Sequence, residues 1–229
     1  MTTLAGYITA VGYLAPGTYP WTGATLTAQQ TLAVNMALRM HSKHRPRVIV
    51  EDVDGDGGFD YALSDLDAWT DGFSVMRQVE YPVDDTDDDA EILDDDDWAI
   101  YETPDGTFLR FLEDTPEADE DFRVTYTGIH DFSGDLSACT VKAFDEEAVQ
   151  ALAASHFLRM LSVYYAQNQD STISADSVGH ASMSAEYAAR AKMLAQVYYD
   201  HLGIKVDGPV PGGFTNAAAP ETDRVRLTH

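Results

Sequence analysis

One short stretch, EDVDGDGGFDYAL, has the residue types and spacing of a cation site. Asp52, Asp54 and Asp56 stand at alternate positions, Gly57 follows, and Asp60 comes shortly afterwards. A calcium loop places oxygen ligands at its odd positions and a glycine at its sixth position. Counted from Asp52, the stretch supplies aspartate at the first, third, fifth and ninth positions and glycine at the sixth.

The end of the stretch and its flanks favour a different structure. A calcium loop needs a bidentate glutamate at its twelfth position, where this chain has Leu63, which cannot ligate. The flanking segments RVIVE and FDYAL have the composition of strands rather than of helices. Gly55, Gly57 and Gly58 suit a hairpin turn, because glycine tolerates positive φ. The sequence therefore predicts a glycine turn between two strands, with a structural cation as the alternative.

Signatures of catalysis are missing from the sequence. It contains no Walker-type loop, G-x-S-x-G, H-E-x-x-H or G-x-G-x-x-G motif. His41 and His44 flank a basic stretch that would repel a cation, and His156 falls on an apolar stripe as a hydrogen-bonded core histidine would. Cys139 is the only cysteine and is expected to be a small buried residue. We expect no enzyme and no cofactor, and we assign no catalytic, cofactor-binding or metal-binding residue.

The charge of the chain is strongly negative and unevenly distributed. There are 39 acidic and 14 basic residues, 28 of the acids are aspartate, and only 4 of the bases are lysine. Such a surface stays hydrated in concentrated salt, where the Debye length falls to roughly 3 Å, and this indicates a halophilic protein. Residues 1–50 contain no acid, and they carry the basic stretch RMHSKHRPR. A nucleic-acid site there is an alternative to a helix end that meets an acidic neighbour.

Hydrophobic periodicity divides the chain into helical and β segments. Residues 1–23 are predicted to be an extended arm, since glycine, proline and threonine are frequent there. A helix is expected from Thr27, which forms a capping-box pattern with Gln30, and Leu32 and Met36 follow at helical spacing.

From about residue 47 to 130, hydrophobic residues recur at every second position, as they do in strands. Six short runs rich in β-branched and aromatic residues predict about six antiparallel strands in a sandwich or open barrel. In the last run, Phe122, Val124 and Tyr126 are expected to face the core. Asp105 and Gly106 predict a tight hairpin.

After residue 144 the helical period returns. Asp145 is expected to cap a helix whose stripe includes Val149, Leu152 and His156. In a second helix, from about Ser184, the residues predicted to share a face are Tyr187, Ala191, Leu194 and Tyr198, with Gly203 as the C-cap. No segment approaches the apolar length of a membrane span, so we expect no contact with a membrane.

The predicted fold class is α+β. One N-terminal helix and a C-terminal helix pair form a bundle with an inserted antiparallel β domain. The expected divisions are an extended arm (1–23), a helical domain (24–45 and 144–203), a β domain (46–143) and an extended C-terminal tail (204–229).

This order of elements resembles the head–tail adaptor (connector) proteins of tailed viruses. The phrases VDGDGGFDYAL, WTDGFSVMRQVEYP, DDWAIYETPDGTFLRF and FRVTYTGIHD are similar to the β domain of such neck proteins. LAASHFLRMLSVYYAQNQDSTISADSV and SAEYAARAKMLAQVYYDHLG are similar to their paired helices. The resemblance covers about residues 25–203 and lies in the order of the pieces. With the acidic composition, it implies a virus of haloarchaea.

The resemblance implies a structural role in the virion neck for a protein made in the host cytoplasm. About twelve copies would form a homo-oligomeric ring that contacts the portal protein and the next neck or tail protein. DNA would pass through its acidic channel without sequence-specific binding, since acid repels phosphate. The acid-free residues 1–50 would then face protein neighbours. Alternatives are another neck or tail-completion protein (a stopper or tail terminator), a calcium-binding β module of a halophilic surface protein, and a halophilic hydrolase.

Overall fold

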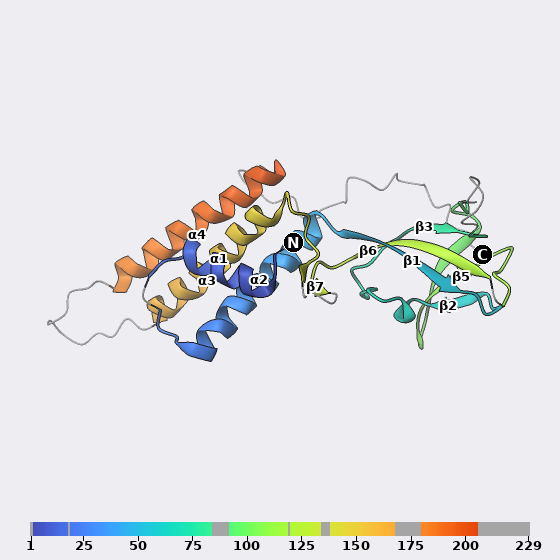
Figure 1. Ribbon diagram of the computed structural model, residues 1–229, viewed down its shortest axis with the longest axis horizontal. Helices are drawn as coiled ribbons and strands as arrows, with labels where there is room; N and C mark the ends of the chain where they lie inside the picture. The colour runs from blue at the N-terminus through green and yellow to red at the C-terminus, as the bar shows by residue number, and fades with distance from the viewer. Residues whose placement is uncertain are drawn as a thin grey trace, which may run out of the picture.

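Four helices pack together at one end of the molecule, and two small sheets lie at the other, as a computed structural model shows (Figure 1). The structure describes residues 2–17, 19–83, 92–118, 120–133, 138–167 and 180–205, and every structural count below refers to these residues. The helices are α1 (Leu4–Leu14), α2 (Gly23–His44), α3 (Glu146–Gln167) and α4 (His180–Leu202). This arrangement confirms the predicted α+β class.

Helix α1 corrects the prediction that residues 1–23 form an extended arm. The Thr3 side chain accepts a hydrogen bond from the Gly6 amide at 3.3 Å and so caps the helix. Tyr7 and Val11, one helical turn apart, are fully buried. The glycines of this segment lower its helix propensity and hid the pattern, whereas burial against the other helices stabilises the helix.

Helix α2 begins earlier than expected and turns a different face inward. It starts at Gly23, so Thr27 lies inside the helix and its hydroxyl donates to the Gly23 carbonyl instead of capping. The buried side chains include Ala33, Ala37 and His41. Leu32 and Met36, the start of the predicted stripe, are respectively 49% and 41% exposed.

Helix α3 is the centre of the bundle and contacts each of the other helices. Val149 and Leu152 are buried on it, as predicted, and Phe157 is buried as well. Ser155 donates a hydrogen bond to the Ala191 carbonyl at 2.8 Å, which shows how closely α4 approaches. The predicted inner face of α4 is also confirmed: Tyr187, Ala191 and Tyr198 are buried and Leu194 packs against the core, while Gly203 ends the helix with φ 71°. No helix in the described ranges combines the length and apolarity that a membrane crossing requires.

The β part consists of two three-stranded antiparallel sheets. One has the order β1 (Arg47–Asp54), β6 (Asp121–Gly128), β3 (Met76–Glu80), and the other the order β2 (Asp60–Ala62), β5 (Gly106–Phe111), β4 (Trp98–Thr103). A short helical turn, η1 (Leu63–Asp65), follows β2, and a ribbon of β7 (Phe132–Ser133) and β8 (Ala138–Cys139) leads back to the helices. These six strands and the β4–β5 hairpin confirm the predictions.

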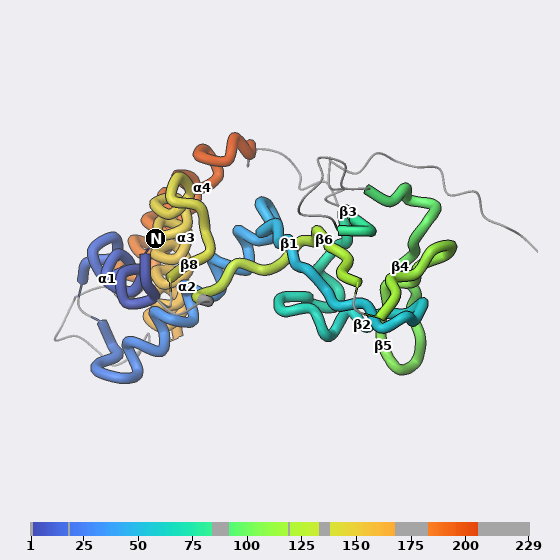
Figure 2. Tube along the Cα trace, turned by 45° about the vertical axis from the view of Figure 1, so that its right-hand side comes forward, coloured from blue at the N-terminus to red at the C-terminus, as the bar shows by residue number. Residues whose placement is uncertain are grey.

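The two sheets enclose a second core, separate from that of the helices. Phe122, Val124 and Tyr126 of β6 point into it and are almost fully buried, as their alternation predicts. Figures 1 and 2 show the helical and β parts arranged along the long axis, joined where β1 begins and β6 ends. The predicted tail lies outside the described residues from position 206 onward.

Candidate functional site

The aspartates of the predicted cation loop do not converge on one point. The Asp52 carboxylate accepts hydrogen bonds from Arg123 Nε at 2.5 Å and Nη2 at 3.1 Å. Asp60 is held in the same way by Arg110, with two bonds of 2.6 Å. These bonds from guanidinium groups hold the pKa of both carboxyl groups below the usual range. No group of three or more His, Cys, Asp or Glu in the described ranges is arranged to hold a metal ion.

The glycine turn is present, but it is not a hairpin. β1 pairs with β6 and β2 pairs with β5, so the turn carries the chain from one sheet to the other. Gly57 has φ 79°, and the Gly58 amide donates to the Asp56 carboxylate at 2.7 Å. The Gly55 amide donates to the Glu120 carbonyl at 2.7 Å. The hairpin prediction was wrong because local turn chemistry does not determine which strands pair.

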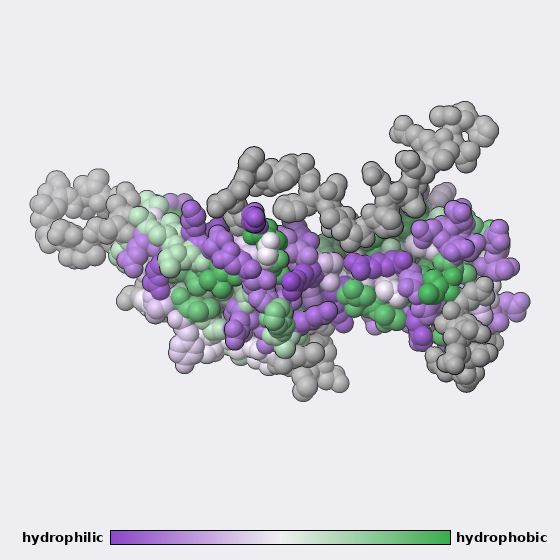
Figure 3. Space-filling model, turned by 90° about the horizontal axis from the view of Figure 1, so that it is seen from above, coloured by the Kyte–Doolittle hydropathy of each residue, from purple (hydrophilic) through white to green (hydrophobic). Residues whose placement is uncertain are grey.

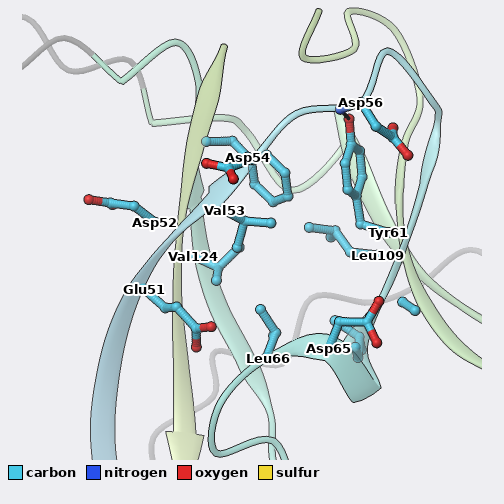
Figure 4. A pocket seen from close by; sticks show the side chains of 13 residues that line it. Glu51, Asp52, Val53, Asp54, Asp56, Tyr61, Asp65, Leu66, Leu109 and Val124 are labelled. Carbon is cyan, nitrogen blue, oxygen red and sulfur yellow. Dashed lines mark hydrogen bonds between the residues drawn. The ribbon is translucent and has the colours of Figure 1, made fainter. Parts of the chain in front are cut away.

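Where the edges of the two sheets meet, a cavity of about 360 Å³ opens beside β1. Its floor is apolar: Figure 4 shows Val53, Leu66, Leu109 and Val124 together in the middle of the view. Acidic residues complete its lining: Glu51, Asp52, Asp54, Asp56 and Asp65, of which Asp52 turns its carboxylate away from the apolar floor (Figure 4). The combination suits an occupant that is apolar on one side and basic on the other.

Glu51 is already fixed within this cavity, whereas Asp54 and Asp65 have no basic partner among the described residues. Glu51 accepts hydrogen bonds from the Asp67 amide at 3.1 Å and from the Tyr126 hydroxyl at 2.6 Å. Burial, together with this bond to a carboxylate, raises the pKa of Tyr126 to about 12. The hydroxyl therefore stays protonated and anchors Glu51.

A cluster of polar side chains lies at the junction between the helical and β parts, and it centres on Asp145. The Asp145 carboxylate, only 4% exposed, accepts hydrogen bonds from Arg45 at 2.6 Å and from His201 at 2.7 Å. Burial acts to raise the pKa of Asp145, but the bonds from His201 and Arg45 outweigh it and the pKa is lowered. The predicted helix-capping residue thus links α2, α3 and α4.

Histidines complete this junction cluster. His41 and His44 both place Nδ1 near the Tyr198 hydroxyl, at 3.2 and 2.9 Å. Because a hydroxyl has one proton, it donates to one ring and accepts from the other. His130 contacts the Arg45 carbonyl through Nε2 at 2.9 Å, so it is a donor at that nitrogen. Burial lowers the pKa of all three histidines, that of His41 to about 4.

The basic stretch RMHSKHRPR thus meets acidic neighbours, as one of the two interpretations predicted. Arg45 is bonded to Asp145, and Arg47 lies 3.9 Å from Asp131. His41 is buried within the stretch. The stretch therefore serves the internal packing of the protein at several of its positions.

The exposed part of the helical bundle carries an apolar groove of about 480 Å³ between α2 and α3. Its lining includes Trp21, Met36, Met160, Val163 and Tyr164. Val163 is 55% exposed and Met36 41%. Apolar side chains also reach the surface elsewhere on both parts of the molecule (Figure 3).

His156 lines the same groove, and its environment differs from the prediction. The sequence predicts a hydrogen-bonded core histidine, but the buried Nε2 atom has no hydrogen-bond partner among the residues that the structure describes. Burial, assisted by nearby Arg159, lowers the pKa of the ring. A neutral, unpaired nitrogen next to an open apolar groove is a group that a covering surface could satisfy.

Comparison with known proteins finds three matching chains among solved structures. No protein-family model matches the chain, and no curated protein matches it. Among solved structures, a chain described as "Virion of native gene transfer agent (GTA) particle" is similar, with 13% sequence identity and a TM-score of 0.29. The match covers 82% of this chain and 91% of that chain.

Sequence reasoning missed both the junction cluster and the groove. The cluster joins His41, His130, Asp145 and Tyr198, which are far apart in the chain, and no local spacing marks them. The groove had a visible indication: an apolar stripe that includes Met36, on a helix that also has a second, alanine-rich face. Two apolar faces on one helix indicate one internal and one external partner.

Proposed function

We propose that this protein is a structural component of the neck of a tailed-virus virion, a head–tail adaptor. Copies of the chain assemble into a ring between the portal and the next neck or tail protein, and the ring continues the DNA channel. The sequence resemblance over about residues 25–203 supports this role, as does the order of the elements: helices, β strands, helices. No catalytic step is part of the proposal.

The observation that carries the proposal is the apolar groove between α2 and α3. Single exposed apolar residues are ordinary, but a groove lined by Trp21, Met36, Val163 and Tyr164 is a feature of surfaces that another protein covers. The unpaired Nε2 of His156 lies at the same place.

A second copy of this chain is the occupant that the charge distribution favours. Every one of the 39 acidic residues lies after position 50, whereas α1 and α2 contain none. The acid-free surface of α2 on one copy is complementary in charge to the strongly acidic part of the next copy, which follows residue 50. Copies can therefore associate head to tail. Such heterologous contacts close into rings when the rotation between copies allows it.

Electron microscopy and native mass measurement in molar sodium chloride test the proposal. We expect closed rings of the purified protein, alone or after addition of the portal. Met36→Asp and Val163→Asp each place a charge in the groove and should abolish the rings while circular dichroism stays unchanged. Leu112→Asp, at a 50% exposed position after β5, is the matched control and should leave rings intact. A monomer under all these conditions, or rings that survive both groove variants, would contradict the proposal.

A further inference from the structure

The loop between β1 and β2 carries an exposed aromatic residue, Phe59. Its side chain is 55% exposed, although phenylalanine is among the residues most often buried. Asp54, Asp56 and Asp60 lie around it in the sequence. Asp60 is bonded to Arg110, whereas Asp54 and Asp56 have no basic partner among the described residues. The loop therefore presents an apolar ring together with two carboxylates that no neighbouring cation neutralises.

The backbone of this loop is already fixed at both ends. The Gly55 amide donates a hydrogen bond to the Glu120 carbonyl at 2.7 Å. The Phe59 carbonyl accepts one from the Phe111 amide at 2.9 Å, so the backbone that carries the ring is bonded to β5. A side chain on a fixed backbone loses little conformational entropy when a partner binds it. Phe59 is thus suited to act as an anchor residue.

The apolar groove between α2 and α3 fits such an anchor. Its lining includes two aromatic residues, Trp21 and Tyr164, and no acid among the described residues. Arg159 is part of the lining, and Arg39 follows the lining residue Met36 by three positions on α2, on the same exposed face. An apolar groove beside basic residues is complementary to an apolar ring beside carboxylates.

The loop lies too far from the groove of its own copy to enter it. The groove belongs to the helical part, whereas β1 leads away from that part over eight residues, about 26 Å at the rise of a strand (Figure 1). The loop follows the end of β1, so it can reach only the groove of another copy. Because loop and groove are different surfaces, each copy can give a loop to one neighbour and receive one from the other.

We propose that Phe59 inserts into the α2–α3 groove of a second copy of the chain. Asp54 and Asp56 then lie beside Arg39 and Arg159 of that copy. This contact rests on the proposed function, because it names the residues through which the copies of the ring associate head to tail.

Two other aromatic side chains are more exposed than Phe59 but lack its surroundings. Tyr13, 80% exposed, lies on α1, which contains no acidic residue. Phe144, 76% exposed, already contacts the ring of His201, with the ring centroids 4.8 Å apart. Phe144 therefore serves as a control in the experiment.

Native mass measurement in molar sodium chloride tests the contact. Phe59→Ala should weaken association of the copies at least about tenfold, because it removes the aromatic anchor. Circular dichroism should stay unchanged, since the side chain is exposed. The matched control, Phe144→Ala, removes the same kind of ring from another surface and should leave association unchanged.

Charge reversal tests the acidic part of the loop. In 1 M salt the Debye length is about 3 Å, so Asp54→Lys/Asp56→Lys should weaken association only if these groups touch the neighbouring copy. Asp95→Lys/Asp96→Lys makes the same change of net charge at exposed positions between β3 and β4 and should have no effect.

A mixture of two variants isolates a single contact. Phe59→Ala keeps the groove but lacks the anchor, while Met36→Asp keeps the anchor but has a charge in its groove. Each variant alone should be monomeric. The mixture should give pairs with one copy of each and nothing larger, because one anchor and one groove remain competent. These pairs report on the contact whether or not rings close.

The outcomes separate this contact from the ring. Wild-type rings that survive Phe59→Ala, or wild-type rings together with a mixture that gives no pairs, would overturn the contact and leave the adaptor proposal standing. Wild-type copies that associate only in open chains, together with pairs in the mixture, would support the contact and contradict the ring. A monomeric wild type and a mixture without pairs would overturn both.

Discussion

The carboxylate of Asp145 lies 2.6 Å from a guanidinium nitrogen of Arg45, a residue 100 positions away in the sequence. The same carboxylate accepts a hydrogen bond from His201 on α4 and lies 3.9 Å from His41 on α2. One buried acid therefore connects the end of α2, the start of α3 and the end of α4. Among the described acids, Asp145 is the one that is buried.

Replacing Asp145 with asparagine should lower the free energy of unfolding by about 2 kcal/mol, because charge-assisted hydrogen bonds at a buried site are lost. Asp131→Asn is the control, since Asp131 is 55% exposed and lies 3.9 Å from Arg47. It should change stability by less than about 0.5 kcal/mol. Denaturant unfolding followed by circular dichroism measures both. Equal effects of the two variants would contradict the central role of Asp145.

Stability should fall as the pH drops from about 6.5 to about 4. Burial lowers the pKa of His41 to about 4, so in this range the unfolded chain binds a proton that the folded protein does not. This stabilisation is fully present above the pKa of histidine in the unfolded chain. It is lost as the pH falls towards the folded pKa of His41, and the free energy of unfolding drops by at most about 3 kcal/mol. His44 and His130 act in the same direction. Unfolding curves at several pH values should show a smaller slope for His41→Gln; an unchanged slope would exclude His41 as the source.

Gly55→Ala should destabilise the protein more than Gly57→Ala does. A Cβ at Gly55 would lie 2.6 Å from the carbonyl oxygens of Glu117 and Glu120, which are backbone atoms that cannot easily move. At Gly57 the cost is that of positive φ, about 1 kcal/mol, with no contact closer than 3.9 Å. Thermal melting of the two variants gives the comparison, and the reverse order would show that the loop after β5 can shift.

Calcium added at constant ionic strength should leave the melting temperature unchanged. Asp52 and Asp60 are each held by an arginine, so the carboxylates that a calcium loop would need are directed elsewhere. Magnesium at the same concentration is the control for general charge screening. A saturable rise in melting temperature with calcium alone would restore the cation interpretation.

Lowering the salt concentration should lower the melting temperature. The net charge of −25 produces self-repulsion, which is screened over roughly 3 Å in 1 M salt and over roughly 30 Å in 0.01 M salt. Melting in sodium chloride from 0.05 to 3 M, compared with sucrose, separates screening from exclusion of cosolutes. A melting temperature independent of salt would contradict the halophilic interpretation.

Local patterns predicted the elements whose neighbours are also local. The alternation of Phe122, Val124 and Tyr126 and the turn at Gly106 gave the correct faces and the correct hairpin. Helix α1 was missed because its stability comes from burial of Tyr7 and Val11 against distant segments. The pairing of β1 with β6 joins residues 67 to 81 positions apart, and no turn residue encodes it.

The candidate sites were also predictable from the sequence only where their residues lie close together in the chain. The aspartates of the loop were visible in the sequence, but their arginine partners, Arg110 and Arg123, lie on strands that only the folded sheets bring close. The junction cluster depends on four separate segments. Its histidines and Asp145 are individually unremarkable in the sequence, so only tertiary structure identifies them.

The pairing of Arg47 with Gly128 has a mechanical consequence. The chain leaves the helices just before Arg47 and returns just after Gly128, and the two passages are bonded to each other from their first residue. The amide of His130 donates to Ser42 at 2.9 Å, which fastens the return passage to α2. A β part joined to the helices by one connection could rotate about it, whereas two connections that are hydrogen-bonded to each other resist that rotation. We therefore expect a tilt of α2 to move the far end of the sheets with it.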